Sequence, residues 1–161
     1  MKVQAEQIGL RPATPADDEF LLSVYASTRA DEMQRVPWNA EQKEAFVRMQ
    51  FAAQKSHYAA AFPQASHDVI CVDKTAVGRI YLDRDPDVFH ILDVTVLPQY
   101  RNQGIGSTLL GRLLAEAGQS GKAVTIYVET FNPSVRLFER LGFQKIEEKD
   151  FQLLMKWQAN P

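Results

Sequence analysis

The 161-residue sequence has a single cysteine, Cys71, and only three histidines. One cysteine can form no internal disulfide, and Cys71 lies in the apolar run Val69-Ile70-Cys71-Val72, where it is expected to be a small buried residue. No group of cysteines and histidines has the spacing of a metal site. We therefore expect neither a structural disulfide nor a bound metal.

Long hydrophobic runs and an excess of one charge are also missing. No apolar stretch approaches the roughly 20 residues of a membrane span, and the polar start of the chain does not resemble a signal peptide. The 18 basic and 20 acidic residues give a formal net charge of −2, which does not favour general binding to nucleic acid or anionic lipid. We expect a cytoplasmic protein without nucleic-acid or membrane partners.

What the sequence does contain is enough apolar material for one ordinary core, 45% of its residues. Its length suits one domain, so residues 1–161 are expected to form a single unit without internal repeats or linkers. Apolar periodicity and cap signals predict strands over 7–13, 68–73, 76–85, 88–97, 123–129, 143–148 and 151–157. They predict helices over 14–32, 39–58, 104–118 and between Asn132 and Gly142. This order is typical of an α/β domain with a mixed sheet and helices on its faces.

The stretch from Ile91 to Ser107 is the most informative segment of the chain. It reads as a strand rich in β-branched residues, then Pro98, which has no N–H to pair with, then a glycine-containing turn that opens a helix. Such a turn presents unpaired backbone N–H groups at a helix N-terminus, and Gly104 and Gly106 have no Cβ to keep a ligand away. The pattern predicts a site for an anion, most naturally a phosphate.

Two common phosphate loops do not match this turn. A Walker loop needs Gly-Lys-Ser/Thr, but Gly106 is followed by Ser107 and Thr108. A dinucleotide fingerprint needs a third glycine at position 109, which is Leu109. The remaining pattern is Arg-x-x-Gly-x-Gly, from Arg101 to Gly106, directly after a strand that ends in Val-x-Pro.

This pattern resembles the acyl-CoA pyrophosphate loop of the GNAT superfamily of N-acetyltransferases. A second segment, from Val128 to Phe143, is similar to the superfamily's sequence of strand, asparagine, short helix and Leu-Gly-Phe. The resemblance covers residues 76–147 well, and the N-terminal third agrees only in its layout. It implies a mostly antiparallel sheet of about seven strands, helices on both faces, and a splay between strands four and five.

The resemblance implies acetyl-CoA as co-substrate and no metal. The pantetheine arm would lie in the splay, held by the backbones of Val94 and Val96, and the Val94 N–H would also polarise the thioester carbonyl. Asn132 matches the family asparagine that contacts the cofactor, although it can equally be a helix cap before Pro133. The pyrophosphate would meet a run of backbone amides with a nearby arginine: Arg101, Asn102, Gln103, Gly104, Ile105, Gly106 and Ser107.

Transfer of an acetyl group to an amine requires the amine to be unprotonated, so a general base is useful. His90 stands where several relatives place a Glu or His base, and regular pairing would put it on the same strand face as Val94 and Val96. A surface or capping histidine is the other interpretation. Asp93 would then face the opposite way as a structural residue, and Glu129, at the end of the fifth strand, is a further candidate base.

Phe138 departs from the family pattern. Many relatives carry at this cofactor-contacting position a tyrosine that protonates the departing thiolate, and phenylalanine has no proton to donate. Because a thiol pKa near 8.5 makes thiolate a tolerable leaving group, the loss would cost roughly 10²-fold or be covered by water. The alternative is a non-catalytic acyl-CoA-binding or regulatory module.

The acceptor is expected to enter beneath the two N-terminal helices. A small-molecule amine, a protein N-terminus and a protein lysine all remain open, and a homodimer is possible by analogy with the family. Each aromatic or polar residue that could line the pocket could also be ordinary packing, and Arg29 with Glu32 could be a surface ion pair. The candidates are Tyr25, Arg29, Glu32, Trp38, Gln50, Gln54 and Tyr58.

Overall fold

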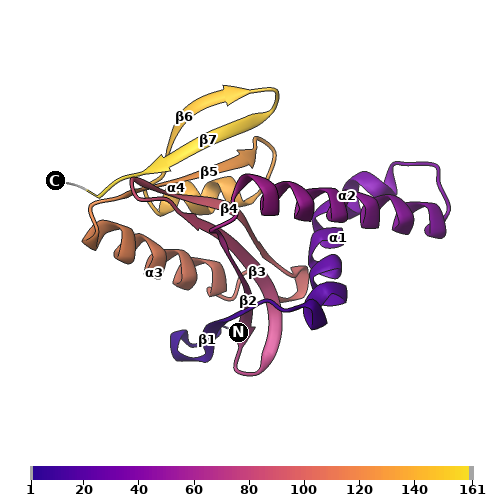
Figure 1. Cartoon of the computed structure of the whole chain (residues 1–161), viewed down its shortest axis with the longest axis horizontal. Coiled ribbons are helices and arrows are strands. Elements are labelled where there is room, and N and C mark those ends of the chain that lie inside the picture. The colour runs from indigo at the N-terminus through magenta and orange to yellow at the C-terminus, as the bar shows by residue number, and fades with distance from the viewer. Residues whose placement is uncertain (1, 160–161) are drawn as a thin grey trace.

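The computed structural model describes residues 2–159, which contain four α-helices and seven strands in the predicted order (Figure 1). The helices are α1 (Asp18–Gln34), α2 (Ala40–Ala61), α3 (Ile105–Gln119) and α4 (Ser134–Arg140). The strands are β1 (Ile8–Pro12), β2 (Ser66–Val72), β3 (Thr75–Arg84), β4 (Val88–Val96), β5 (Ala123–Glu129), β6 (Gln144–Lys149) and β7 (Gln152–Trp157).

Local sequence signals account for the helix starts. The Asn39 side chain accepts a hydrogen bond from the Gln42 N–H at 2.8 Å, and the Gln42 side chain returns one to the Asn39 N–H at 3.0 Å. This reciprocal cap is the predicted start of α2. The first helix begins later than predicted, because a short 3₁₀ turn over Pro15–Asp17 precedes α1. The Asp17 carboxylate then accepts from the Thr14 N–H at 2.8 Å.

The strands form one sheet in the order β1-β2-β3-β4-β5-β7-β6, and the β4–β5 pair is its parallel neighbour pair. That pair runs from Val88 opposite Ala123 to Ile91 opposite Ile126 and stops there. Past this point β4 continues against β3, and β5 continues against β7 as far as Glu129. The sheet therefore splays between β4 and β5, as the sequence resemblance implied.

A bulge at Leu92 precedes the splay. Tyr81 of β3 lies opposite Asp93 and the next residue, Leu82, lies opposite Ile91, so Leu92 is an extra residue on β4. The bulge reverses the alternation of side chains along the strand: Ile91 and Val94 both pack into the core beneath α3. His90 therefore faces away from Val94, and the expectation that they share a face is wrong because pairing is irregular. Asp93, expected opposite His90, shares its face.

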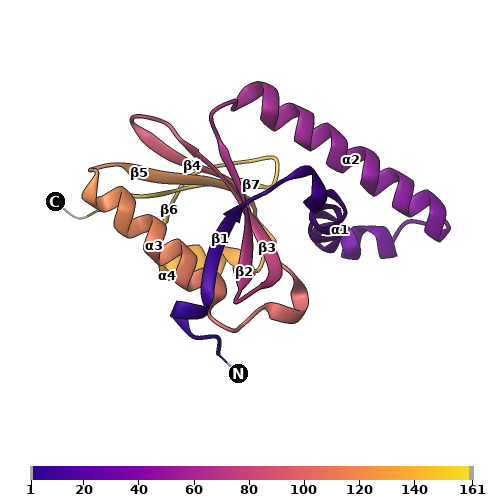
Figure 2. The ribbon, with the colours of Figure 1, turned by 60° about the horizontal axis from the view of Figure 1, so that its bottom comes forward.

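Helices cover both faces of the sheet. In Figure 2, α3 and α4 lie together on one side and α1 and α2 lie on the other. The predicted apolar stripe of α3 is buried: Ile105, Leu109, Leu110, Leu113, Leu114 and Ala117. Its first turns pack against β1, β2 and β3, and the rest packs against β4, β5 and β7. Helices α1 and α2 pack on each other through a separate cluster that includes Leu21 and Phe51. None of the helices within residues 2–159 is long and apolar enough to cross a membrane.

Candidate functional site

The splay leaves backbone groups of β4 facing an open side. The Leu97 N–H donates to the Val77 carbonyl of β3 at 2.8 Å, and backbone polar groups alternate in direction along a strand. The N–H groups of Val94 and Val96 therefore point toward β5, whose pairing with β4 ends at Ile91. The Arg101 side chain reaches the Val96 carbonyl from this side, at 3.0 Å. An extended ligand can hydrogen-bond here as an added strand does.

The turn that follows β4 is shaped as an anion cradle. Asn102 has φ 63° and Gly104 has φ 86°, so the chain makes two left-handed steps before α3 begins. The first helical hydrogen bond runs from the Thr108 N–H to the Gly104 carbonyl at 3.0 Å, which leaves the N–H groups of Ile105, Gly106 and Ser107 without helical acceptors. These groups and the helix dipole favour a phosphate at this end of α3.

Position 106 also lies close to α4. A Cβ built on Gly106 would stand 3.4 Å from the Leu137 side chain of α4, an ordinary contact distance, whereas one on Gly104 would meet no atom within 4 Å. Gly104 is therefore required by its backbone conformation rather than by close packing. On the other side of the turn, the Gln103 carbonyl accepts from the Val3 N–H at 3.0 Å, which ties the cradle to the N-terminal segment.

Glu129 lies across the splay from Val94, one position further along the sheet. It stands three residues beyond the last β4–β5 pair, Ile91 with Ile126, whereas the bulge at Leu92 leaves Val94 only two ladder positions beyond that pair. Because Ile126 and Val128 are buried in the core beneath α3, Glu129 points to the opposite face, where Arg29 of α1 lies 3.7 Å from its carboxylate. Its carboxylate is thus partly exposed beside the split, on the side of the sheet that carries α1.

His90 lies further back along the same face. It pairs with Thr125, one residue before pairing stops, and its Nδ1 is 2.7 Å from the Thr125 hydroxyl. Glu129 is four positions beyond Thr125 on β5, roughly 13 Å at the usual strand rise. The structure therefore does not bring the two candidate bases together. Within residues 2–159, the ligand atoms of His90, Asp83 and Asp85 lie within 4.8 Å of one another, as exposed acidic groups often do without a cation.

A buried polar cluster lies between α2 and the sheet. The Arg79 side chain, only 3% exposed, forms an ion pair with Asp93 and donates to the Gln54 side chain at 2.6 Å. Sequence reasoning did not single out Arg79, although a lone charge in the apolar run Val77-Gly78-Arg79-Ile80 was a usable signal. Next to it, Tyr58 donates its hydroxyl to the Leu92 carbonyl at 3.0 Å. Burial, together with the charge of Asp93, raises the pKa of Tyr58 and keeps its hydroxyl a donor.

The other residues expected to line the acceptor pocket lie either in the helical core or outside it. Tyr25 is buried against Phe51 with ring centroids 5.6 Å apart, so it belongs to the helical core. Trp38 packs edge-on against Phe46 outside that core. Arg29 and Glu32 form the ion pair expected of neighbours on a helix, at 3.0 Å. The Gln50 Oε1 atom is buried without a hydrogen-bond partner among the described residues.

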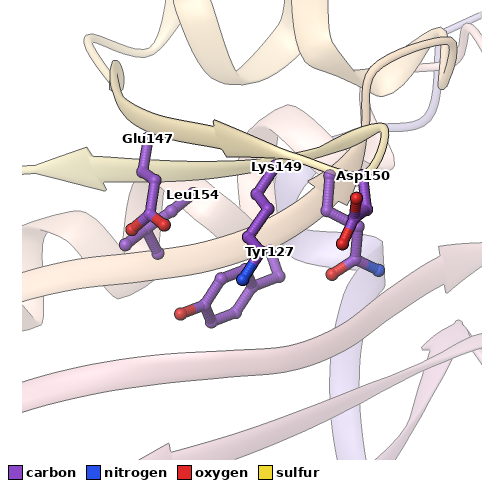
Figure 3. Close-up of a pocket in the computed structure, with 6 residues that line it drawn as sticks. Tyr127, Glu147, Lys149, Asp150 and Leu154 are labelled. Carbon is purple, nitrogen blue, oxygen red and sulfur yellow. The ribbon is translucent and has the colours of Figure 1, made fainter.

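A groove of about 410 Å³ opens on the face of the sheet that carries Glu129 (Figure 3). Tyr127, 66% exposed although β5 is an inner strand, projects into it beside Leu154. The groove is lined by Tyr127, Glu147, Lys149, Asp150, Gln152 and Leu154. Its floor is formed by β5, β7 and β6 and is open to solvent at Tyr127.

Asn132 and Phe138 occupy different surroundings. The Asn132 side-chain oxygen accepts from the Ser134 N–H at 2.9 Å and from the Ser134 hydroxyl at 2.8 Å, so it holds the start of α4 as a cap does. Asn132 itself is exposed. Phe138 is 1% exposed and packs edge-on against Phe143, with centroids 5.3 Å apart. Protein atoms alone cover its ring, so the structure does not place Phe138 where a cofactor touches it.

Comparison with known proteins identifies the family. Residues 26–143, more than half of the chain, match the model of the acetyltransferase (GNAT) family. The chain therefore belongs to the GNAT family of acetyltransferases. It is also similar to N-alpha-acetyltransferases of Sulfurisphaera tokodaii, 31% identical over 61 residues, and Saccharolobus solfataricus, 33% identical over 61 residues. Each of these matches covers 36% of this chain and 36% of the relative.

Solved structures support the same fold. The PaiA N-acetyltransferase of Thermoplasma acidophilum, in complex with coenzyme A, has a TM-score of 0.72 at 19% identity and covers 94% of this chain and 99% of its own. A GNAT family acetyltransferase of Elizabethkingia anophelis, with acetyl-CoA bound, has a TM-score of 0.62 at 14% identity, over 96% of this chain and 99% of that one. At these identities the likeness shows the fold.

Proposed function

We propose that this protein is an N-acetyltransferase that moves the acetyl group of acetyl-CoA to a primary amine by direct transfer in a ternary complex. The observation that carries the proposal is the continuity of two features on one edge of β4. The open N–H groups of Val94 and Val96 lead directly into the N–H cradle at the start of α3. Together they suit a molecule with an extended amide-containing arm and a pyrophosphate, which is the shape of acetyl-CoA.

The residues at the split have separate roles in the proposed reaction. The amine nitrogen attacks the thioester carbon, the carbonyl oxygen gains negative charge, and the Val94 N–H stabilises that charge. The carbon–sulfur bond then breaks and the thiolate leaves with its electron pair. Glu129 is the proposed base, because it lies across the split from Val94 and takes the proton that the amine loses. His90, the other candidate, lies four residues before Val94, where β4 is still paired with β5.

The acceptor is proposed to approach along the groove that Tyr127 occupies. Two acidic side chains line the groove, Glu147 and Asp150, against one basic side chain, Lys149, and Glu129 beside it is paired with Arg29. This balance attracts a cationic amine. The N-alpha-acetyltransferase relatives support a protein N-terminus as the first class of acceptor to test, followed by protein lysines and small-molecule amines.

A second function is favoured by one observation. Phe138 supplies no acid for the leaving thiolate, and its burial leaves no room for another group to act from that position. A protein that binds acyl-CoA without transferring the acyl group would tolerate both. This alternative predicts normal cofactor binding and no consumption of thioester with any amine.

Calorimetric titration with acetyl-CoA, CoA and ATP is the first test. We expect both CoA species to bind and ATP to bind at least tenfold more weakly, because ATP has no pantetheine arm for the split. Thioester consumption is then followed across peptides with free N-termini, lysine peptides and small amines. Absence of binding to either CoA species would overturn the proposal. Binding without consumption across the panel would favour the acyl-CoA-binding module.

A further inference from the structure

The Tyr58 hydroxyl on helix α2 forms a hydrogen bond to the bulge of β4. Tyr58 donates to the carbonyl of Leu92 at 3.0 Å, and Leu92 is the extra residue of β4 that β3 does not pair with. The carbonyl of a bulge residue falls outside the regular ladder and needs another partner when it is buried. The Tyr58 hydroxyl supplies that partner, so a side chain from a helix completes the hydrogen bonding of the strand.

A second connection lies one helical turn earlier. Gln54, four residues before Tyr58 and on the same face of α2, accepts from Arg79 at 2.6 Å. Arg79 in turn pairs with Asp93, whose other carboxylate oxygen accepts from the Thr95 hydroxyl at 3.0 Å. Since Arg79 is almost fully buried, this chain of contacts cannot exchange freely with water. Helix α2 therefore holds Leu92 and Asp93, two successive residues of β4.

These two residues immediately precede Val94. The direction of the Val94 N–H depends on how the bulge turns the backbone at Leu92, because the bulge decides which way each later residue faces. A donor that stabilises charge in a transition state must lie within a few tenths of an ångström of its best position. A contact that holds the bulge in one conformation therefore also fixes the direction of the Val94 N–H group.

We propose that Tyr58 is a positioning residue, which sets the aim of the Val94 N–H through its hydrogen bond to the Leu92 carbonyl. This inference rests on the proposed function, since it gives Val94 the role of polarising the thioester. It also links α2 to the strand whose open edge is proposed to hold the thioester.

Tyr58→Phe tests the hydroxyl alone. The Tyr58 ring packs edge-on against Tyr81 with centroids 5.0 Å apart, and the substitution keeps this contact, so the variant is expected to fold. Tyr81→Phe is the matched control, because it removes a hydroxyl from the adjacent ring and leaves the bond to Leu92 in place. Both variants are compared with the unchanged protein by thermal unfolding and by calorimetry with acetyl-CoA.

The deciding measurement needs no acceptor. A ketone analogue of acetyl-CoA, with methylene in place of the thioester sulfur and ¹³C at the carbonyl, is bound to each protein and its ¹³C chemical shift is recorded. Hydrogen bonding to the carbonyl moves this resonance downfield. We expect the same downfield shift in the unchanged protein and in Tyr81→Phe. In Tyr58→Phe we expect at least half of that shift to be lost, with affinity for the analogue within threefold.

Turnover gives a second readout once an acceptor is known. We expect Tyr58→Phe to lower kcat about tenfold with KM for acetyl-CoA within threefold, because the contact acts on the reacting carbonyl rather than on cofactor binding. An unchanged ¹³C shift in bound Tyr58→Phe would overturn the positioning role and leave the proposed function intact. Failure of the unchanged protein to bind the analogue would overturn the proposed function and this inference with it.

Discussion

The guanidinium of Arg29 on α1 lies 3.7 Å from the carboxylate of Glu129 on β5. Arg29 also bonds to Glu32 at 3.0 Å, so a helical ion pair continues to the edge of the split. The contact orients the Glu129 carboxylate on the face where the acceptor is proposed to arrive, across the split from Val94. The first helix thereby contributes to the placement of a proposed catalytic group.

Glu129→Gln is expected to lower kcat by about 10² to 10³, because the amide cannot take the proton of the attacking amine. Acetyl-CoA affinity should remain within threefold. His90→Gln is the comparison variant, with an expected loss below fivefold, since His90 lies one residue before the end of the β4–β5 pairing. The kcat values of the two variants are compared by steady-state kinetics with one acceptor. A larger loss in His90→Gln than in Glu129→Gln would assign the base role to His90.

Ser107→Glu separates cofactor binding from folding. Ser107 is an exposed residue in the first turn of α3, where a carboxylate interacts favourably with the helix dipole, so stability should be unchanged or rise by about 0.5 kcal/mol. The same charge repels a pyrophosphate, and acetyl-CoA affinity should fall at least 100-fold. Gln119→Glu adds an equal charge at the far end of α3 as the control. Normal acetyl-CoA affinity in a folded Ser107→Glu protein would show that the pyrophosphate does not bind at this turn.

The order of elements and the turn between β4 and α3 followed from local sequence signals. Pro98, Gly104 and the leucine stripe of α3 each act within a few residues, so the strand, turn and helix could be read directly. The bulge at Leu92 could not, because it depends on pairing with β3 ten or more residues away in the chain. That one irregularity is why His90 and Val94 were assigned to the same face.

Contacts between elements that are distant in the sequence also determine where individual side chains are buried. Arg79 lies in a run of apolar residues, and only the approach of α2 with Gln54 and of β4 with Asp93 makes its burial favourable. Phe138 was assigned to the cofactor by its place in the motif, but the packing of α4 against Phe143 turns its ring into the core. Sequence spacing locates a residue on a helix and does not by itself fix which neighbours it meets.

Phe138→Tyr is expected to destabilise the protein without raising turnover. The new hydroxyl would enter a fully packed core, where an unpaired polar group costs about 1–3 kcal/mol. Urea unfolding measures the loss, and turnover is compared at a temperature where both proteins are folded. A rise in turnover of tenfold or more would show that a tyrosine at position 138 reaches the leaving thiolate, and that the core position of this ring is not maintained during catalysis.

His67 gives the protein a predictable sensitivity to acid. Burial, with the positive charge of Arg79 adding to it, lowers the pKa of His67 to about 4, compared with about 6.5 for an unfolded histidine. Between these two pH values the unfolded chain binds a proton that the native protein does not bind. The free energy of unfolding therefore falls as the pH drops from about 6.5 to about 4. After allowance for solvent screening of the partly exposed ring, we expect this contribution to be about 1 kcal/mol.

His67→Gln removes this proton linkage. The variant loses the stacking of His67 on Tyr81, with centroids 4.4 Å apart, so it should be less stable than the parent at pH 7. The difference between the two proteins should shrink as the pH falls toward 4, because only the parent has the histidine to protonate. Urea unfolding at pH 7, 5.5 and 4.5 follows this difference. A difference that stays constant across the three pH values would contradict the assignment.

The turn between β6 and β7 is strained beside the groove. Asp150 has φ 52° and Phe151 has φ 66°, and both positions favour asparagine or glycine in a two-residue hairpin turn. Phe151 nevertheless holds one of them with 75% of its surface exposed, between Asp150 and Gln152, which line the groove. A bulky residue at a left-handed position costs about 1 kcal/mol or more, and such strain is often retained for function.

Phe151→Gly is therefore expected to stabilise the protein by about 0.5–1 kcal/mol and to raise KM for the acceptor several-fold, because it relieves the backbone and removes apolar surface at the groove. Asp150→Asn is the control, since asparagine also suits the left-handed conformation and leaves the ring in place. Urea midpoints measure the first effect and acceptor titrations at saturating acetyl-CoA the second. A gain in stability with unchanged KM would make Phe151 a surface residue without a role in acceptor binding, and a loss of stability would show that its ring packs on neighbours in a way that outweighs the strain.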